Sequence, residues 1–131
     1  MASELTFDIE RQNFYSTVFV QNHIFRFPDG GCLFHVEFYY GAVLLVSCSA
    51  EGRVWLFDHE ISVGKGSKLC LRLVASNLDF YLFFVEVESP RGMVDKGTLR
   101  VGLDGMVFFN DNVIETAKSR SKYAKALMLC G

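Results

Sequence analysis

The sequence is poor in proline and has no strong excess of charge of either sign. Only 2 of its 131 residues are proline, and 13 basic against 15 acidic side chains give a formal net charge of −2. This small charge argues against a strong general affinity for nucleic acids or anionic membranes. Half of the residues are hydrophobic, which excludes a disordered or low-complexity chain. A chain of this length is expected to form a single domain, residues 1–131.

Signals for secretion or membrane insertion are also missing. The first twenty residues include several charged side chains and lack a basic start followed by an apolar block, so no secretory signal is recognised. The apolar run 32–50 alternates and contains polar residues near its middle, which is not typical of a spanning helix. We therefore expect the protein in the cytoplasm or the nucleus.

The four cysteines contain no Cys-x-x-Cys pair. Cys32, Cys48 and Cys70 fall within expected strands, and with Cys130 they are predicted to be reduced thiols, the first three packed as small apolar groups. Cys32 and His35 would lie on opposite faces of a strand and could not share a zinc ion. No metal or cofactor is expected.

Apolar and polar residues alternate with a period of two through most of the chain. Segments such as 34–40, 68–75 and 80–88 are predicted as strands with one buried face. Turn signals recur about every 8–12 residues, and Asp104-Gly105 predicts a final hairpin. The pattern predicts an all-β protein, an antiparallel β-sandwich of about nine short strands over residues 14–110.

The C-terminal segment departs from this alternation and predicts a basic amphipathic α-helix over residues 113–129. Residues 115–131 carry four basic groups and one acid, or +3, so the remainder of the −2 chain sums to −5. The helix either covers an edge or end of the sandwich with its lysines in solvent, or docks onto a partner. The candidate partner-binding residues are Lys118, Arg120, Lys122, Lys125, Leu127 and Met128.

No arrangement of residues points to catalysis. The three histidines, His23, His35 and His59, fall in different strands or strand ends, far from the pattern of a nucleophile with its base. His35 and Glu37 share a face, as expected of polar residues on a solvated strand. The glycine- and lysine-rich segment 64–68 lacks the length and the following helix of a phosphate-binding loop, which favours a hairpin turn. We expect a binding protein, not an enzyme.

The single tryptophan marks a candidate ligand site. A period of two places Arg53, Trp55, Phe57 and His59 on one face of a strand. An aromatic ring flanked by charged groups can stack on a sugar while those groups bind its hydroxyls, so Arg53, Trp55 and Asp58 are candidate ligand-binding residues. The alternative is that Trp55 and Phe57 belong to the core, with Arg53 at its rim.

The order of these features resembles the galectin family. A Phe-rich strand ends at Gly41, the acidic Asp58 follows Trp55, and the hairpin 99–107 is similar to the closing Leu-x-Ile-x-Gly-Asp-Val strand of that family. The resemblance implies a jelly-roll sandwich and carbohydrate binding. The His-x-Asn-Pro-Arg motif of the family has no counterpart here, and its Trp-x-x-Glu-x-Arg motif would fall on Trp55, Asp58 and Glu60.

The sequence therefore favours a non-catalytic binding module for protein–protein interaction, including homodimerisation. Its binding surface would be an aromatic sheet face, the basic C-terminal helix, or both. One alternative is a galectin-like carbohydrate binder that uses Trp55. Another is a pleckstrin-homology-like module that binds a lipid headgroup or a peptide near the 65–68 loop. Neither nucleic acid nor a membrane is indicated strongly as a partner.

Overall fold

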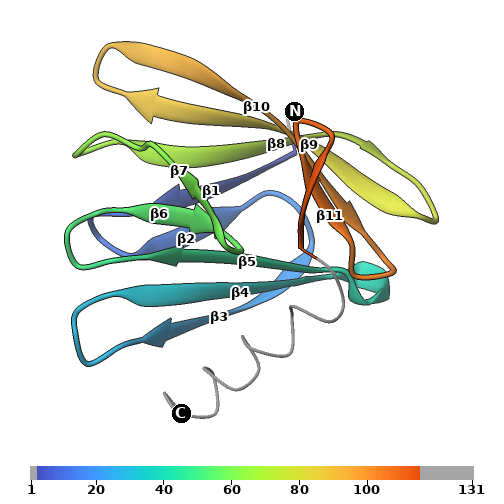
Figure 1. Cartoon of the computed structure of the whole chain (residues 1–131), viewed down its shortest axis with the longest axis horizontal. Coiled ribbons are helices and arrows are strands. Elements are labelled where there is room, and N and C mark those ends of the chain that lie inside the picture. Colours follow the sequence, from blue (N-terminus) through green and yellow to red (C-terminus); the bar gives the residue numbers. More distant parts are fainter. Residues whose placement is uncertain (1–2, 116–131) are drawn as a thin grey trace.

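The computed structural model describes residues 3–115, which form two antiparallel β-sheets (Figure 1). One sheet has seven strands in the order β12-β11-β10-β9-β8-β1-β2, and the other has five in the order β3-β4-β5-β6-β7. Among the described residues no helix has the length and apolar character needed to cross a membrane. The elements are β1 (Glu4–Asp8), β2 (Asn13–Ser16), β3 (Val20–Arg26), β4 (Cys32–Phe38), the 3-10 turn η1 (Tyr39–Gly41), β5 (Val43–Cys48), β6 (Val54–Leu56), β7 (His59–Ile61), β8 (Lys68–Ser76), β9 (Phe80–Ser89), β10 (Gly92–Gly102), β11 (Val107–Phe109) and β12 (Asn112–Glu115).

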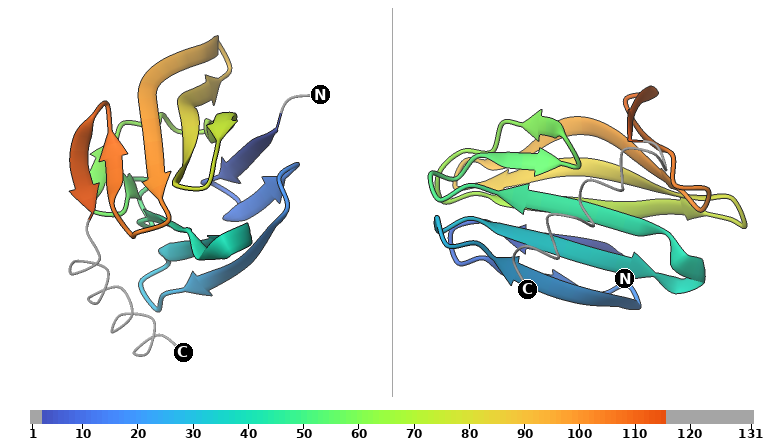
Figure 2. Two further views of the ribbon diagram at one scale, coloured as in Figure 1. Left: turned by 90° about the vertical axis from the view of Figure 1, so that its right-hand side faces the viewer. Right: turned by 60° about the horizontal axis from the view of Figure 1, so that its bottom comes forward.

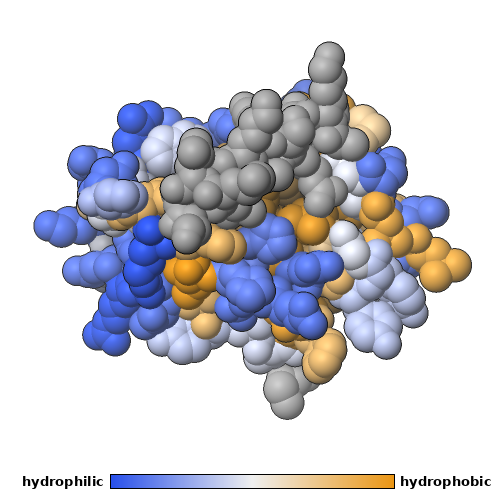
Figure 3. Space-filling view, turned by 90° about the horizontal axis from the view of Figure 1, so that it is seen from below, coloured by the Kyte–Doolittle hydropathy of each residue, from blue (hydrophilic) through white to orange (hydrophobic). Residues whose placement is uncertain are grey.

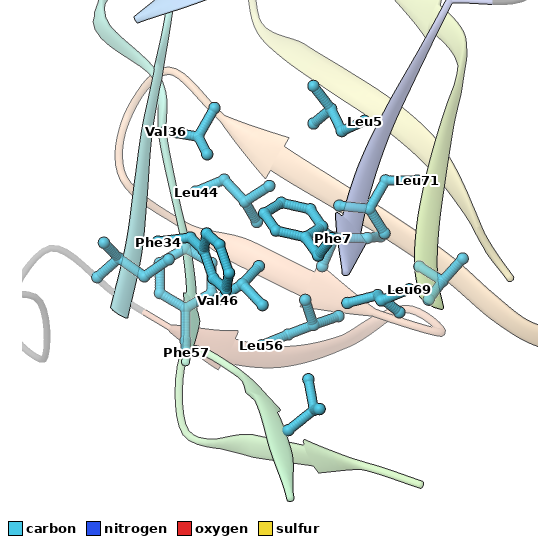
Figure 4. Close-up of a cluster of buried hydrophobic side chains, with 14 of the residues drawn as sticks. Leu5, Phe7, Phe34, Val36, Leu44, Val46, Leu56, Phe57, Leu69 and Leu71 are labelled. Atoms are coloured by element: carbon cyan, nitrogen blue, oxygen red, sulfur yellow. The ribbon is translucent and has the colours of Figure 1, made fainter. Parts of the chain in front are cut away.

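The two sheets lie face to face with the hydrophobic core between them. In the right-hand view of Figure 2 the five-stranded sheet lies in front of the seven-stranded one. Phe7 of β1 packs edge-on against Phe34 of β4, with ring centroids 5.2 Å apart, and Figure 4 shows Phe7 reaching toward Phe34 and Leu44. Phe38 of β4 and Phe83 of β9 also join the sheets, with tilted rings whose centroids are 5.6 Å apart. The predicted all-β class is confirmed, and the two-sheet arrangement fits a β-sandwich.

The alternation of the sequence explains which face of each strand is buried. In β4, Phe34 and Val36 are fully buried whereas Glu37 is exposed. Val46 and Leu44 lie directly opposite these two residues on β5, so four apolar side chains cover the same patch of the inner face. Burial of such a face is the main stabilising contribution to a sheet of this kind.

The structure has more strands than the nine or so that were predicted, and they extend beyond the predicted residues 14–110. The structure has twelve strands within residues 3–115, and the first begins at Glu4. In β1, Leu5 and Phe7 are fully buried, so this segment carries the same alternation over only five residues. At residues 17–19, between β2 and β3, the chain passes from one sheet to the other.

The predicted C-terminal helix is wrong at its start. Val113, Ile114 and Glu115 belong to β12, which pairs with β11 at the edge of the seven-stranded sheet. The unpaired backbone groups of β11 favour a further strand there, and β-branched residues suit it. The remainder of the expected helix lies outside the described residues, as do all of the candidate partner-binding residues Lys118, Arg120, Lys122, Lys125, Leu127 and Met128.

Candidate functional site

The turn after β6 divides the site that was predicted around Trp55. Phe57 has a φ of 54°, in the left-handed region, and the chain returns immediately as β7. This turn removes Phe57 from the alternation and places its side chain in the hydrophobic core, 2% exposed. His59 pairs with Leu56 and so lies on the opposite face from Trp55. The prediction that Trp55 shares a face with Phe57 and His59 is therefore wrong, whereas the alternative of a core position is confirmed for Phe57.

Arg53 and Glu60 are charged neighbours of Trp55. Trp55 and Glu60 lie directly opposite each other on β6 and β7. Arg53 donates two hydrogen bonds to the Glu60 carboxylate, from Nε at 2.9 Å and from Nη2 at 2.7 Å, which lower the pKa of Glu60 below its ordinary value. The guanidinium carbon of Arg53 also lies 5.2 Å from the Trp55 ring centroid. Asp58 lies in the turn that joins the two strands.

An exposed aromatic cluster, which the sequence analysis missed, lies at one end of the two sheets. Phe19, Tyr39 and Tyr40 are 83%, 63% and 73% exposed, and their ring centroids are 6.4 Å apart for Phe19–Tyr39 and 4.9 Å apart for Tyr39–Tyr40. We call these three residues the aromatic end cluster. Figure 3, which views the molecule from below, shows hydrophobic residues at the surface of the right-hand end, among hydrophilic ones.

Tyr40 has an unusual backbone conformation within this cluster. The alternation of β4 predicts a buried Tyr40, but the strand ends at Phe38 and Tyr40 adopts φ 72° and ψ 9°. A non-glycine residue in this region costs on the order of 1–3 kcal/mol. The Tyr81 hydroxyl donates a hydrogen bond to the Tyr39 carbonyl oxygen at 3.3 Å, which helps to hold the turn. The signal in the sequence is Tyr-Tyr-Gly directly after a buried strand, since glycine there marks a turn.

A hollow of about 230 Å³ adjoins the aromatic end cluster. It extends from the cluster to the start of β3, where Val20 and Gln21 line it, and to the end of β4, where Glu37 and Phe38 do. Strand β3 is an edge strand of its sheet, so within the described chain no further strand pairs with its outer side. The hollow therefore combines apolar walls, one carboxylate and a sheet edge.

A second cavity, of about 400 Å³, lies among three turns at the other end of β5. Lys65 lines it together with Glu10 and Glu51. Two carboxylates thus face the same space as the lysine on which the lipid-headgroup alternative depends, which disfavours a phosphate ligand. The segment 64–68 forms a turn closed by a hydrogen bond from the Ser67 amide to the Gly64 carbonyl at 3.1 Å. The predicted turn is confirmed, but it is not a hairpin, because the strands β7 and β8 that it joins belong to different sheets.

Cys32 and Cys48 meet in the core although they are sixteen residues apart in the chain. They lie directly opposite each other on β4 and β5, with their Sγ atoms 3.1 Å apart. Both thiols are free and buried, as is that of Cys70. The hydrogen bond with Cys48, together with burial, raises the pKa of the Cys32 thiol above its ordinary value. The same hydrogen bond lowers the pKa of the Cys48 thiol, and both side chains belong to the hydrophobic core.

No group of three or more His, Cys, Asp or Glu side chains within residues 3–115 is arranged to hold a metal ion.

The comparisons of the chain with protein-family models, with curated proteins and with solved structures find no match.

Proposed function

We propose that this protein is a non-catalytic binding module that captures an extended peptide segment of a partner protein at the aromatic end cluster. The observation that carries the proposal is Tyr40, whose 73% exposed ring is held by an unfavourable left-handed backbone. Such strain is found mainly at functional sites, because a ring that packs so little does not offset its cost. Exposed tyrosine and phenylalanine are also the residue types that dominate protein-binding surfaces.

The edge of β3 supplies the second element of this proposal. An extended peptide can pair with the free backbone groups of an edge strand, while its side chains enter neighbouring pockets. The hollow beside β3 has Tyr39 and Phe38 to receive an apolar side chain and Glu37 to attract a basic one. The partner segment is therefore extended and carries an apolar anchor next to a lysine or arginine.

Selection of random linear peptides displayed on phage against the full chain tests this proposal. We expect the selected peptides to carry apolar and basic residues and to shift backbone amide NMR signals within residues 18–24 and 37–41. Because exposed aromatic anchors contribute about 1–2 kcal/mol each, Phe19→Ala should weaken binding about tenfold.

The matched control is Val94→Ala, which removes an exposed apolar side chain (46%) from another part of the molecule and should leave peptide affinity unchanged. A selection that yields no specific peptide, or peptides whose signals shift elsewhere, would refute the proposal.

A second proposed function is carbohydrate binding, favoured by the grouping of Arg53, Trp55 and Glu60. A half-buried indole beside a bidentate ion pair provides a ring for stacking and polar groups for sugar hydroxyls. In this proposal the two sheets form the jelly-roll that the galectin resemblance implies. Binding of the full chain on a glycan array should disappear in Trp55→Ala with an unchanged circular dichroism spectrum. An array on which the intact chain binds no glycan contradicts this function.

A further inference from the structure

On one half of the outer face of the seven-stranded sheet, arginine side chains lie among aromatic rings. The guanidinium carbon of Arg100, on β10, lies 4.3 Å from the ring centroid of Phe108 and 5.6 Å from that of Phe80. Arg72, on β8, lies in the same manner over Phe84, at 5.1 Å. These contacts fix two flat cations among aromatic rings on a surface that faces away from the core.

Arg100 has no counter-ion in the part of the chain that the structure describes. The ion pairs found there are Arg53–Glu60 and Arg72–Glu86, and neither involves Arg100. Its contacts with the two rings restrict the side chain, so less conformational entropy remains to be lost when it binds an anion. Arg100 is thus a positive charge positioned for a partner.

The other half of the same face carries several carboxylates and one lysine, Lys68 of β8, which lies directly opposite Glu88. Strand β9 continues beyond Phe84 with Glu86 and Glu88 on the outer side, while Val85 and Val87 between them are buried. Asp95 lies opposite Glu86 on β10. Glu88 and Asp95 are exposed and, like Arg100, take part in no ion pair of the described chain.

We propose that this face is the interface between two copies of this chain. This proposal deepens the proposed function. It rests on that function only in assuming that the molecule binds proteins, since its surface and its partner are different. A two-fold axis that lies in the interface, perpendicular to the strands at the level of Val85, would bring the cationic half of each copy onto the acidic half of the other.

The register of the sheet supports this pairing. Arg100 lies opposite Leu82 and Met93 lies opposite Glu88, and residues 82 and 88 are equally far from residue 85. The axis therefore brings Arg100 level with Glu88 of the partner subunit, and the same contact occurs twice. Exposed Phe84 (39%) and Met93 (52%) supply apolar area between the charges.

A second copy fits this face better than an unrelated acidic partner. An acidic protein that approached Arg100 would also meet Glu88 and Asp95, and the chain as a whole carries a net charge of −2. Like charges across an interface are unfavourable and suppress such partners. A second copy of the chain presents positive and negative side chains, and the two-fold axis places each of them opposite the other charge.

Sedimentation equilibrium of the full chain tests the proposal, with charge reversals at the two ends of the face. We expect the unmodified chain to be a dimer. Arg100→Glu and Glu88→Arg should each raise the dissociation constant at least ~100-fold, about tenfold for each of the two equivalent contacts. An equimolar mixture of the two variants should form a heterodimer, because both of its contacts then join opposite charges.

Arg11→Glu is the matched control, since it makes the same change of charge at an exposed residue of the β1–β2 turn. It should leave the dimer intact. A full chain that sediments as a monomer overturns the proposal, as does a dimer that neither reversal weakens or that mixing fails to restore. Peptide binding at the aromatic end cluster is measured with separate variants, so its failure is distinguishable from failure of the dimer.

Discussion

Tyr40 combines an exposed ring with a left-handed backbone. Its backbone conformation lowers the stability of the fold, whereas its side chain serves peptide binding in the proposed function. Glycine adopts φ 72° without steric cost, and little packing is lost with a ring that is 73% exposed. We therefore expect Tyr40→Gly to raise the free energy of unfolding in urea by about 0.5–1 kcal/mol. The same variant should bind the selected peptides more weakly, because an aromatic anchor is lost.

Tyr39→Gly is the control for this prediction. Tyr39 has a similar exposure, 63%, but its φ is not positive, so glycine relieves no strain there and should lower stability. A Tyr40→Gly protein that is less stable than the unmodified chain would show that the conformation is not strained.

At the scale of elements, the contact between β10 and the turn that follows β11 depends on a glycine. Gly97 follows a bulge in β10 and has φ 127°. A Cβ atom at this position would collide with the side-chain amide of Asn110, whose Oδ1 accepts a hydrogen bond from the Thr98 amide at 2.9 Å. We expect Gly97→Ala to lower the free energy of unfolding by about 2–3 kcal/mol, as measured by urea denaturation.

Gly92→Ala separates the collision from the backbone strain. Gly92 has φ 117°, and nothing lies within 4 Å of the place that its Cβ would take. This variant should lose about 1 kcal/mol from strain alone. Equal losses at the two positions would contradict the role assigned to the side chain of Asn110.

At the scale of the molecule, the two sheets should unfold together because one core joins them. Phe7→Ala, in the seven-stranded sheet, removes a fully buried ring that contacts Phe34 of the five-stranded sheet. We expect a loss of about 3–5 kcal/mol and a single transition, with Trp55 fluorescence and far-UV circular dichroism giving the same midpoint. Phe19→Ala, which removes a ring that is 83% exposed, should change stability by less than about 1 kcal/mol. Separate midpoints for the two signals would show that the sheets unfold independently.

Parts of the candidate sites could be predicted from local pattern, and other parts could not. Trp55 and Arg53 do lie together, because they are two residues apart on neighbouring positions of one face. Glu60 was not assigned to the site because the sequence does not show that the chain reverses at Phe57 and brings Glu60 opposite Trp55. The aromatic end cluster was missed because Phe19 and the two tyrosines are brought together only by the pairing of β3 with β4.

Alternation of side chains along single strands determined the all-β class and the buried faces, and the turn residues Asp104-Gly105 determined the hairpin of β10 and β11. Each of these properties depends on residues within one strand or one turn, so the sequence contains the whole cause. The tertiary structure alone decided which strands are neighbours. With them it decided the position of the Arg100 guanidinium between Phe80 and Phe108 and the approach of Cys32 to Cys48. These contacts join residues that are distant in sequence, and they follow from the sheet order that best buries the apolar faces as a whole.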